Sequence, residues 1–413
     1  MDRIRKKPEK PIMNVQQPAG YPVGESIDDH QIPFWHNPAR RALVYQLAAL
    51  IITAAIGGYL FHNTVVNLKR QSIATGFGFL EREASFEIGE SPIPFSASQS
   101  YARALLVGLL NTIKVAVTGV CLSLVLGLFV GICRLSGNWL VARLAALYIE
   151  VFQDIPVLLQ LFFWYAVFYD SLPPPRLAIT PLPGVFLCNR GLIFAVPQDH
   201  PAYRAMAAAF LAGCVIVFLL RRWARKRQER TGRIFPVVRT SFGMLLGLPF
   251  MVWAGAGFPV AIRVPQLSGF NFSGGMAISP EFTALLLGLV LYTAAFVAEI
   301  VRAGIQAVSK GQSEAAMAIG LKPWQIMNLV ILPQALRIII PPLTSQMMNL
   351  TKNSSLAVAI GYPDFVSVAS TTINQTGQAI EGVAMIMVIY LIMSLITSAF
   401  MNWYNRKKAI IER

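Results

Sequence analysis

The chain has 413 residues, of which 55% are hydrophobic and only 13% carry a charge. Soluble domains have roughly 25% charged residues, so this composition argues against a soluble domain and predicts a multispan membrane protein. The net charge of +15 would be compatible with nucleic-acid binding. The basic clusters, however, lie at the ends of apolar runs, as the positive-inside rule describes for membrane spans. We therefore expect no nucleic-acid partner.

Eight apolar runs are long enough to be membrane spans, each of which needs about 20 residues to cross the hydrocarbon core. In chain order they cover 42–61, 104–133, 145–169, 204–221, 242–262, 281–303, 337–360 and 382–402. The predicted fold class is all-α, a polytopic membrane protein with about eight transmembrane helices. Basic residues near both chain ends and in 221–233 predict that both termini and this loop are cytoplasmic.

The apolar runs and loops divide the sequence into segments of different character. Nearly all distinctive motifs lie in two of these segments, and between them two spans with few motifs indicate an insertion. The Pro-rich loop 170–203 is expected to form an ordered cap on the outer side. The predicted divisions are 1–41, 42–101, 102–169, 170–280, 281–403 and 404–413, with the first a cytoplasmic segment and the last a cytoplasmic tail.

The stretch SEAAMAIGLKPWQIMNLVILPQALR, which begins at Ser313, is only moderately apolar and lies between spans six and seven, in a predicted cytoplasmic loop. Ser313 is expected to N-cap a short helix with Glu314 in its first turn. Gly320 should close that helix in the left-handed conformation. Pro323 should open a second helix, which Pro333 ends or kinks. The stretch therefore predicts a helical hairpin at the membrane surface.

The spacing within this stretch resembles the EAA motif of permease subunits of ABC importers: E-A-A, three residues, G, nine residues, then I-x-L-P. The matching residues are Glu314, Ala315, Ala316, Gly320, Leu332 and Pro333. Val330 stands at the isoleucine position. The resemblance implies that the loop 309–337 is a coupling helix, seated in a groove of a cytoplasmic ATPase subunit. It implies a transport subunit that is not an enzyme.

The chain contains no G-x-x-x-x-G-K-[ST] loop that would cradle a nucleotide phosphate. We therefore expect this chain to bind no cofactor, with ATP and Mg²⁺ held by the partner ATPase. The four cysteines show no metal-ligand spacing, and no metal site is expected.

Other stretches resemble the permeases for polar amino acids, and the extra spans and long loops resemble the general L-amino-acid permease subunits within that family. The stretches that carry the resemblance are Tyr148–Tyr165, Leu291–Leu321 and Asn349–Phe365. Many such permeases have Arg-Gly-Thr-Pro where this chain has Gln153-Asp154-Ile155-Pro156, so no role is transferred to these four positions.

The resemblance implies a five-helix type I importer core, built from 102–169 and 281–403, in the inner membrane of a bacterium. It also implies an amino-acid substrate and a periplasmic amino-acid-binding protein as a partner. The translocation path would form from two copies of the chain or from this chain and a sister permease. The general amino-acid systems favour the sister chain.

Ionisable residues within spans are functional candidates, because a charge in the membrane is costly unless it is used or paired. They are Lys114, Glu150, Asp154, Glu299, Arg302 and Lys352. Glu299 offers an acceptor for the ammonium group of an amino acid, and Lys352, with the polar residues that follow it, offers donors for the carboxylate. The candidate substrate path is therefore Glu299, Lys352, Asn353, Ser354 and Ser355. The alternative is a simple ion pair between Glu299 and Lys352.

Small residues recur in the second span, where Gly108, Gly119, Gly127 and Gly131 predict close helix packing. Two other functions agree less well with the sequence. An ion-coupled secondary transporter of small polar solutes would be expected to show inverted repeats, and no convincing repeat is present. A membrane-embedded enzyme would need catalytic residues within a span, but the four histidines lie outside the apolar runs, and no span holds H-E-x-x-H or G-x-S-x-G.

Overall fold

The computed structural model describes residues 38–70, 75–232 and 235–408. The chain separates into two units, 1–74 and 75–413. In the first, the described residues form one helix, α1 (Pro38–Arg70), whose apolar part is exposed along its length. The predicted cytoplasmic N-terminal segment lies outside the described residues as far as position 37, as do the last five residues of the predicted tail.

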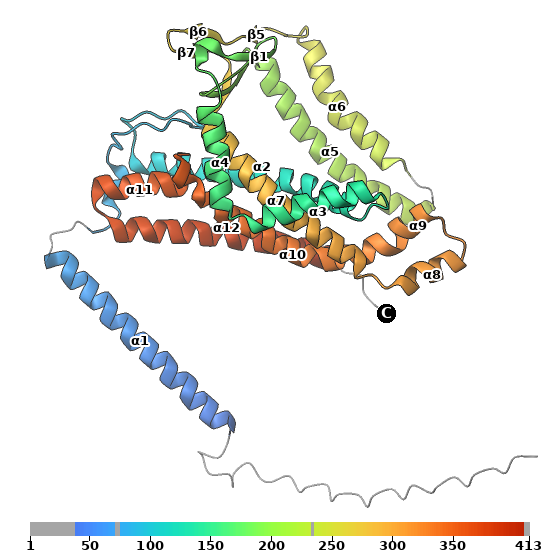
Figure 1. The fold of residues 1–413 in the computed structure, drawn as a ribbon, viewed down its shortest axis with the longest axis horizontal. Coiled ribbons are helices and arrows are strands. Elements are labelled where there is room, and N and C mark those ends of the chain that lie inside the picture. Colours follow the sequence, from blue (N-terminus) through green and yellow to red (C-terminus); the bar gives the residue numbers. More distant parts are fainter. Residues whose placement is uncertain (1–37, 71–74, 233–234, 409–413) are drawn as a thin grey trace, which may run out of the picture. The chain divides into compact units, whose positions relative to one another are not determined.

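Seven described helical segments are long and apolar enough to cross a membrane, or eight if a bent pair counts as one span. This confirms the predicted polytopic, largely helical fold. One of them is α1, in the first unit. The long helices of the second unit are α2 (Tyr101–Arg134), α5 (Pro201–Thr231), α6 (Val237–Gly255), α7 (Pro280–Gln306), α10 (Leu332–Asn353) and α12 (Ala379–Lys408). Figure 1 shows their order along the chain.

The third predicted span, 145–169, is not one continuous helix. The chain forms two helices instead, α3 (Trp139–Asp154) and α4 (Val157–Asp170), bent by 103°. Pro156 causes the break, because a residue that precedes proline avoids the helical conformation, and Ile155 is accordingly extended. The side-chain amide of buried Gln160 donates hydrogen bonds to the carbonyls of Phe152 (3.0 Å) and Ile155 (2.9 Å), which the end of α3 leaves open.

The centre of the second unit is the packing of α2 against α7, which also contacts α3, α4 and α10. The glycines of α2 allow this close approach. A methyl group on Gly127 would lie 2.5 Å from Val297 Cβ, and one on Gly131 would lie 2.9 Å from the carbonyl oxygen of Ala298. The predicted close packing along this helix is confirmed.

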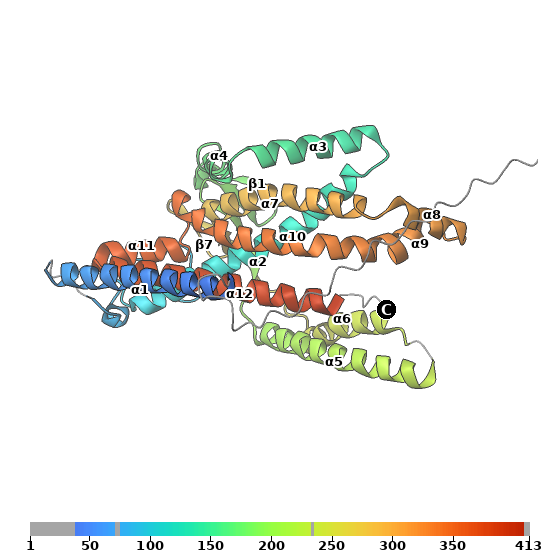
Figure 2. The same cartoon turned by 90° about the horizontal axis from the view of Figure 1, so that it is seen from below.

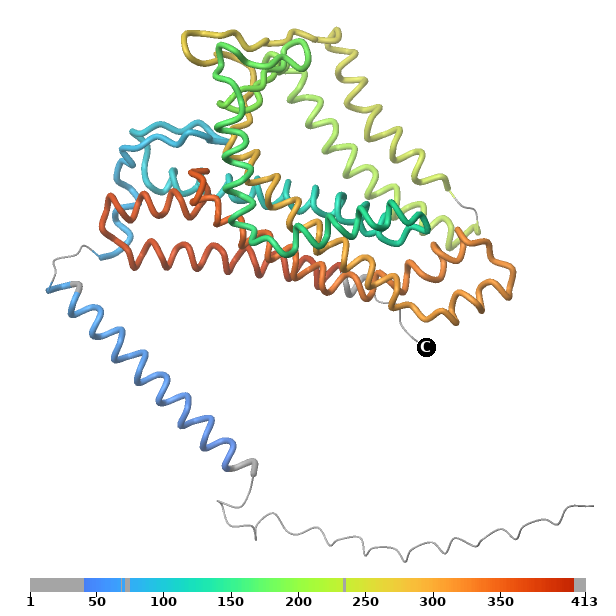
Figure 3. The backbone as a smooth tube through the Cα atoms, in the orientation of Figure 1, coloured from blue at the N-terminus to red at the C-terminus, as the bar shows by residue number. Residues whose placement is uncertain are grey.

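A short helix absent from the sequence prediction, α11 (Phe365–Thr376), packs on α2 and α12. It follows the 3₁₀ segment η5 (Ser354–Ile360), and Asp364 caps its first turn by accepting from the backbone N–H of Ser367 at 2.9 Å. The segment 75–100, with the 3₁₀ turn η2 (Gly78–Glu81), covers the same end of α2. Figure 3 follows this segment into α2.

The two loops that flank α5 and α6 form a cap of short strands, which the helical pattern did not predict. Four strands lie in the order β1-β2-β3-β8, and β4-β5 and β6-β7 form two separate antiparallel pairs. The strands are β1 (Ile179–Leu182), β2 (Val185–Cys188), β3 (Gly191–Phe194), β4 (Val196–Pro197), β5 (Ile262–Arg263), β6 (Gln266–Ser268), β7 (Asn271–Ser273) and β8 (Met276–Ile278). A 3₁₀ turn, η3 (Pro175–Leu177), precedes β1.

The helices α5 and α6 pack against each other, and neither packs along a helix of the core. The contact uses a stripe of small residues on α5, including buried Gly213, Val217 and Ala224. Figure 1 shows that the pair leaves and returns to the strand cap, and Figure 2 shows the two helices side by side. We call this pair, α5 and α6 together, the α5–α6 arm.

Candidate functional site

The hairpin that carries the EAA-like residues consists of α8 (Lys310–Ala318) and α9 (Pro323–Ile326). The predicted start of the first helix is wrong, since Ser313 is the fourth residue of α8 and does not cap it. Only three residues separate α8 from α7, and Ser309, the last of them, already has the extended backbone of an N-cap position. Glu314 therefore lies beyond the first turn, in the middle of α8, where it is exposed.

Gly320 closes α8 as predicted. Its φ is +82°, in the left-handed region that favours glycine. The N–H of Gly320 donates to the carbonyl of Met317 at 2.9 Å, and the N–H of Leu321 donates to the carbonyl of Ala316 at 3.1 Å. These two bonds form a Schellman motif, which fixes the direction in which the chain leaves α8.

Pro323 is the first residue of α9, as predicted, and the N–H of Lys322 donates to Gln325 Oε1 at 2.9 Å. Of the two outcomes expected for Pro333, that it ends the helix or kinks it, the structure contradicts the first. A π-helical turn, η4 (Met327–Ile331), follows α9 and leads directly into α10, so that 323–360 forms a single candidate span. The wider π turn directly before it takes up the distortion that proline, which has no N–H, would otherwise impose on the helix.

The tip of the hairpin exposes large apolar side chains. Met317 is 56%, Ile319 78% and Trp324 75% exposed. Ala315 is exposed beside Glu314, while Ala316 and Ile326 are buried within the hairpin. Leu332 and Pro333 lie half-buried at the return to the core. A cluster of exposed apolar groups on a structured tip is typical of a docking surface.

The predicted substrate-path residues fall into two places. Lys352 and Asn353 end α10, and Ser354 and Ser355 begin η5. Lys352 is exposed, whereas Ser354 is fully buried. Both serine hydroxyls donate within the helix, from Ser354 to the carbonyl of Thr351 and from Ser355 to the carbonyl of Lys352, each at 2.7 Å.

Glu299 lies on α7, half-buried, and pairs with Arg302 one turn later. Nε of Arg302 donates to Glu299 Oε2 at 2.8 Å, and a second guanidinium nitrogen donates to the other carboxylate oxygen. Arg302 also donates to Gln306 Oε1 at 2.6 Å. The alternative ion pair between Glu299 and Lys352 is wrong: over 38–70, 75–232 and 235–408, Lys352 forms no ion pair.

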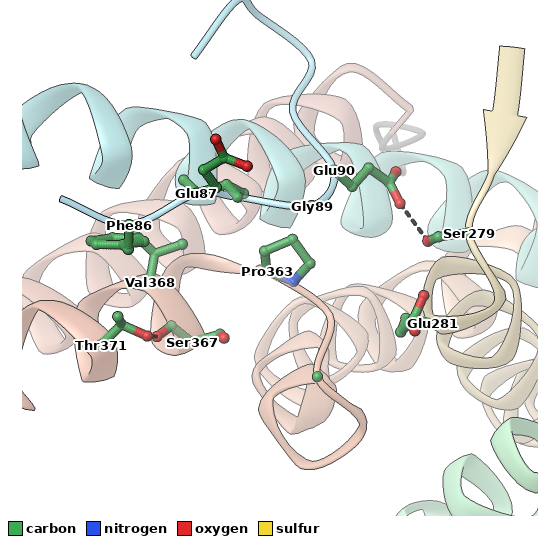
Figure 4. Close-up of a pocket in the computed structure, with 12 residues that line it drawn as sticks. Phe86, Glu87, Gly89, Glu90, Ser279, Glu281, Pro363, Ser367, Val368 and Thr371 are labelled. Atoms are coloured by element: carbon green, nitrogen blue, oxygen red, sulfur yellow. Dashed lines mark hydrogen bonds between the residues drawn. The ribbon is translucent and has the colours of Figure 1, made fainter. Parts of the chain in front are cut away.

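A second polar cluster lies where the segment 75–100 meets α2 and α7, and sequence reasoning singled out only Lys114 of it. The Glu90 carboxylate accepts from the Lys114 ammonium and from the Ser279 hydroxyl, the latter at 2.5 Å. The Lys114 ammonium also lies 4.1 Å from the centre of the Phe282 ring. A cavity of about 410 Å³ opens beside Glu90, with Glu87 and Glu281 on its walls (Figure 4).

Asp364 is the most completely buried carboxyl group of the described chain, with no exposed surface. Burial raises its pKa to about 6. It accepts from the Tyr390 hydroxyl at 3.2 Å and caps α11, so it joins α11 to α12. The sequence holds a signal for it, since an Asp that follows a Pro and precedes an apolar helical pattern is a common N-cap.

The class of protein follows from comparison with known families. The family model for "binding-protein-dependent transport system inner membrane component" matches residues 229–410, which include the hairpin and α10 to α12. With the relatives below, this match places the chain in that family. It is a multi-pass permease component of an ABC transport system in the inner membrane and not an enzyme. The ion-coupled alternative does not fit this family.

Two curated relatives match nearly the full chain. The general L-amino acid transport system permease protein AapQ of Rhizobium johnstonii is 50% identical over 92% of this chain and 94% of its own length. The putative amino-acid ABC transporter permease protein YhdX of Escherichia coli is 48% identical over 91% of this chain and 96% of its own. A crystal structure of an amino acid ABC transporter with histidines covers 74% of this chain and 95% of the solved chain, with 22% identity and a TM-score of 0.44.

Proposed function

We propose that this chain forms part of the translocation path of an ATP-driven importer for amino acids. In this proposal the α8–α9 hairpin is the surface through which a separate ATPase subunit moves the membrane helices. The observation that carries the proposal is the hairpin tip, where Met317, Ile319 and Trp324 are exposed beside Glu314. The names of the two relatives support amino acids as the substrate class.

The connections of the hairpin support a mechanical role. Three residues join α8 to α7, and the π turn joins α9 to α10 without a break in the helical chain. The helices α7 and α10 pack closely, since a methyl group on Gly304 would lie 2.2 Å from Ile339 Cγ1. A force on the hairpin therefore acts on two helices that move together, and α7 carries it on to α2, α3 and α4.

The charges at the candidate substrate path suggest how a zwitterion is held. Lys352 is exposed, and its ammonium group is available for the substrate carboxylate. The Glu299 carboxylate is shared with Arg302, so the substrate ammonium group competes for one of its oxygens. We infer that a periplasmic amino-acid-binding protein delivers the substrate and that a sister permease completes the path. ATP and Mg²⁺ belong to the ATPase partner.

The test is the charge reversal Glu314→Lys in the complex with its ATPase. The exposed side chain makes no contact that folding needs, so yield and thermal stability should stay unchanged. In the proposal Glu314 faces positive charge on the ATPase, and the substitution would bring two like charges together, which costs several kcal/mol. Co-purification of the ATPase should therefore fall at least about tenfold, and uptake of amino acids should stop. Glu81→Lys, on the exposed turn η2, is the matched control and should leave both intact. Normal ATPase binding with Lys at position 314 would refute the coupling role.

A further inference from the structure

The helix α5 is longer than the membrane core requires. Its apolar part, 202–220, is about 28 Å long at 1.5 Å per residue, close to the thickness of the hydrocarbon region. The helix then continues without a break to Thr231 and adds about 16 Å. The final turns therefore pass through the layer of lipid headgroups.

Basic side chains surround this extension. We use the name basic collar for Arg221, Arg222, Arg225, Lys226, Arg227, Arg230 and Arg239, the last from the first turns of α6. All but Arg227 are exposed. Between 221 and 239 the only acidic residue is Glu229. In the described part of the chain no member of the collar forms an ion pair with a carboxylate. An anion from outside the chain could therefore bind these seven positive charges.

Aromatic rings hold two of these side chains. The Arg227 guanidinium lies 5.2 Å from the Trp223 ring centre and 6.0 Å from that of Phe235, and the two rings meet edge to face at 5.5 Å. The Arg222 guanidinium lies 4.8 Å from the Phe218 ring centre. A guanidinium group that lies on a ring face keeps its in-plane N–H donors free. Two of these donors can bind two oxygens of one phosphate group. Trp and basic residues are typical of the membrane interface.

The arm needs an anchor at this end. At its other end it is tied by the pairing of β3 with β8 and of β4 with β5, whose strands flank α5 and α6. Over the described residues, neither helix packs along a helix of the core, and the strand pairs hold the capped end. The basic end is also the place where the helix leaves the hydrocarbon region.

We propose that the basic collar binds the headgroups of anionic phospholipids and thereby fixes the free end of the α5–α6 arm at the membrane surface. Charges that radiate from a helix directly beyond its apolar part fit a layer of lipid phosphates, which surrounds the helix on every side. A protein partner would cover one face. Each basic side chain close to an anionic surface strengthens binding about fivefold.

The experiment uses the purified permease complex in detergent, with bound lipids counted by native mass spectrometry during titration with phosphatidylglycerol or phosphatidylcholine. The complex should bind phosphatidylglycerol at least about tenfold more tightly. The variant R222Q/R225Q/K226Q/R230Q should lose this preference, and R225Q/R230Q should lose part of it. The control K69Q/R70Q neutralises the basic end of α1 and should keep the preference.

Circular dichroism establishes that each variant keeps its helices, and the milder double variant provides the test if the quadruple variant does not fold. An unchanged preference in folded collar variants would overturn the proposal, and so would equal binding of the two lipids to the unaltered complex. Loss of the preference in inorganic phosphate, but not in chloride of the same ionic strength, would show a site for free anions. Loss of ATPase binding in the quadruple variant, with lipid binding intact, would show a protein-docking surface. Either outcome would overturn the lipid assignment, and uptake is measured separately.

Discussion

Gly304 on α7 and Ile339 on α10 provide a direct measurement of how closely the two hairpin-bearing helices pack. In Gly304→Ala the new methyl group would lie 2.2 Å from Ile339 Cγ1 and 3.0 Å from Ile339 Cδ1. Ile339 is buried, and Cγ1 is too near its backbone to move aside. Overpacking of this kind costs about 1–3 kcal/mol, while alanine is favoured over glycine in a helix by up to about 1 kcal/mol. The substitution should therefore lower stability by up to about 2 kcal/mol.

The sign should reverse once Ile339 is truncated. Ile339→Ala alone should cost about 2–5 kcal/mol, because it removes packing and leaves a cavity. In that background the next atom near the new methyl group is the Ala335 carbonyl oxygen, at an ordinary 3.5 Å. Gly304→Ala should then raise stability by about 1 kcal/mol through helix propensity and partial filling of the cavity. The coupling between the two sites should be about 1–3 kcal/mol in favour of the double variant.

The assay is equilibrium unfolding in mixed detergent micelles, followed by circular dichroism, for the four members of the cycle. The control is Gly247→Ala on α6, where an added methyl group meets nothing within 4 Å. It should change the free energy of unfolding by the same amount whether residue 339 is Ile or Ala. If Gly304→Ala changes stability equally with Ile339 or Ala at position 339, to within about 0.5 kcal/mol, the two helices are not in this contact.

Buried Asp364 should make stability depend on pH. Its folded pKa of about 6 exceeds the ordinary 3.8, so the folded chain binds this proton more tightly, and stability should fall between about pH 4 and pH 7. Asp364→Asn keeps an acceptor for the cap of α11 and should flatten that fall in denaturation profiles. Gly320→Ala places a side chain at φ +82°, which costs about 1 kcal/mol, and should weaken ATPase co-purification, while Gly311→Ala, where φ is ordinary, should not. Glu90→Gln should lower the thermal midpoint by depriving Lys114 of its partner, and adding Lys114→Gln should lower it little further.

Each of these expectations has a result that contradicts it. Equal pH slopes for the Asp and Asn forms would mean that residue 364 titrates alike in the folded and unfolded chain. Equal ATPase binding by the two glycine variants would mean that the turn at Gly320 does not set the hairpin. Fully additive losses at Glu90 and Lys114 would mean that these side chains do not act as a pair.

Local chemistry explains what the sequence could predict. Apolar runs of span length identified the membrane helices, because burial in lipid depends on composition more than on neighbours. At the hairpin, Gly320 and Pro323 act through their own backbone limits, and both have the predicted roles. The N-cap prediction for Ser313 fails because Ser309, four residues earlier, takes the N-cap position and Ser313 lies within α8.

Other features depend on partners distant in the sequence. An apolar run does not reveal direction, so the 103° bend at Pro156 was hidden within a continuous hydrophobic stretch. The ion pair of Lys114 joins a span to a loop acid, Glu90, which carries no mark of its own. The strands of the cap were missed because each has four residues or fewer, and because β3 and β4 pair with strands of the other loop, β8 and β5.

The pairing of β3 with β8 brings the two ends of the inserted stretch together. Phe194, where the first strand ends, lies directly opposite Met276, where the second begins, and the strands are antiparallel. A turn of two residues is enough to join such neighbours. The stretch 195–275 could therefore be removed and replaced by a short turn without a change in the separation of α4 and α7. A shortened chain closed by an Asn-Gly turn would show whether the core folds and transports without the α5–α6 arm.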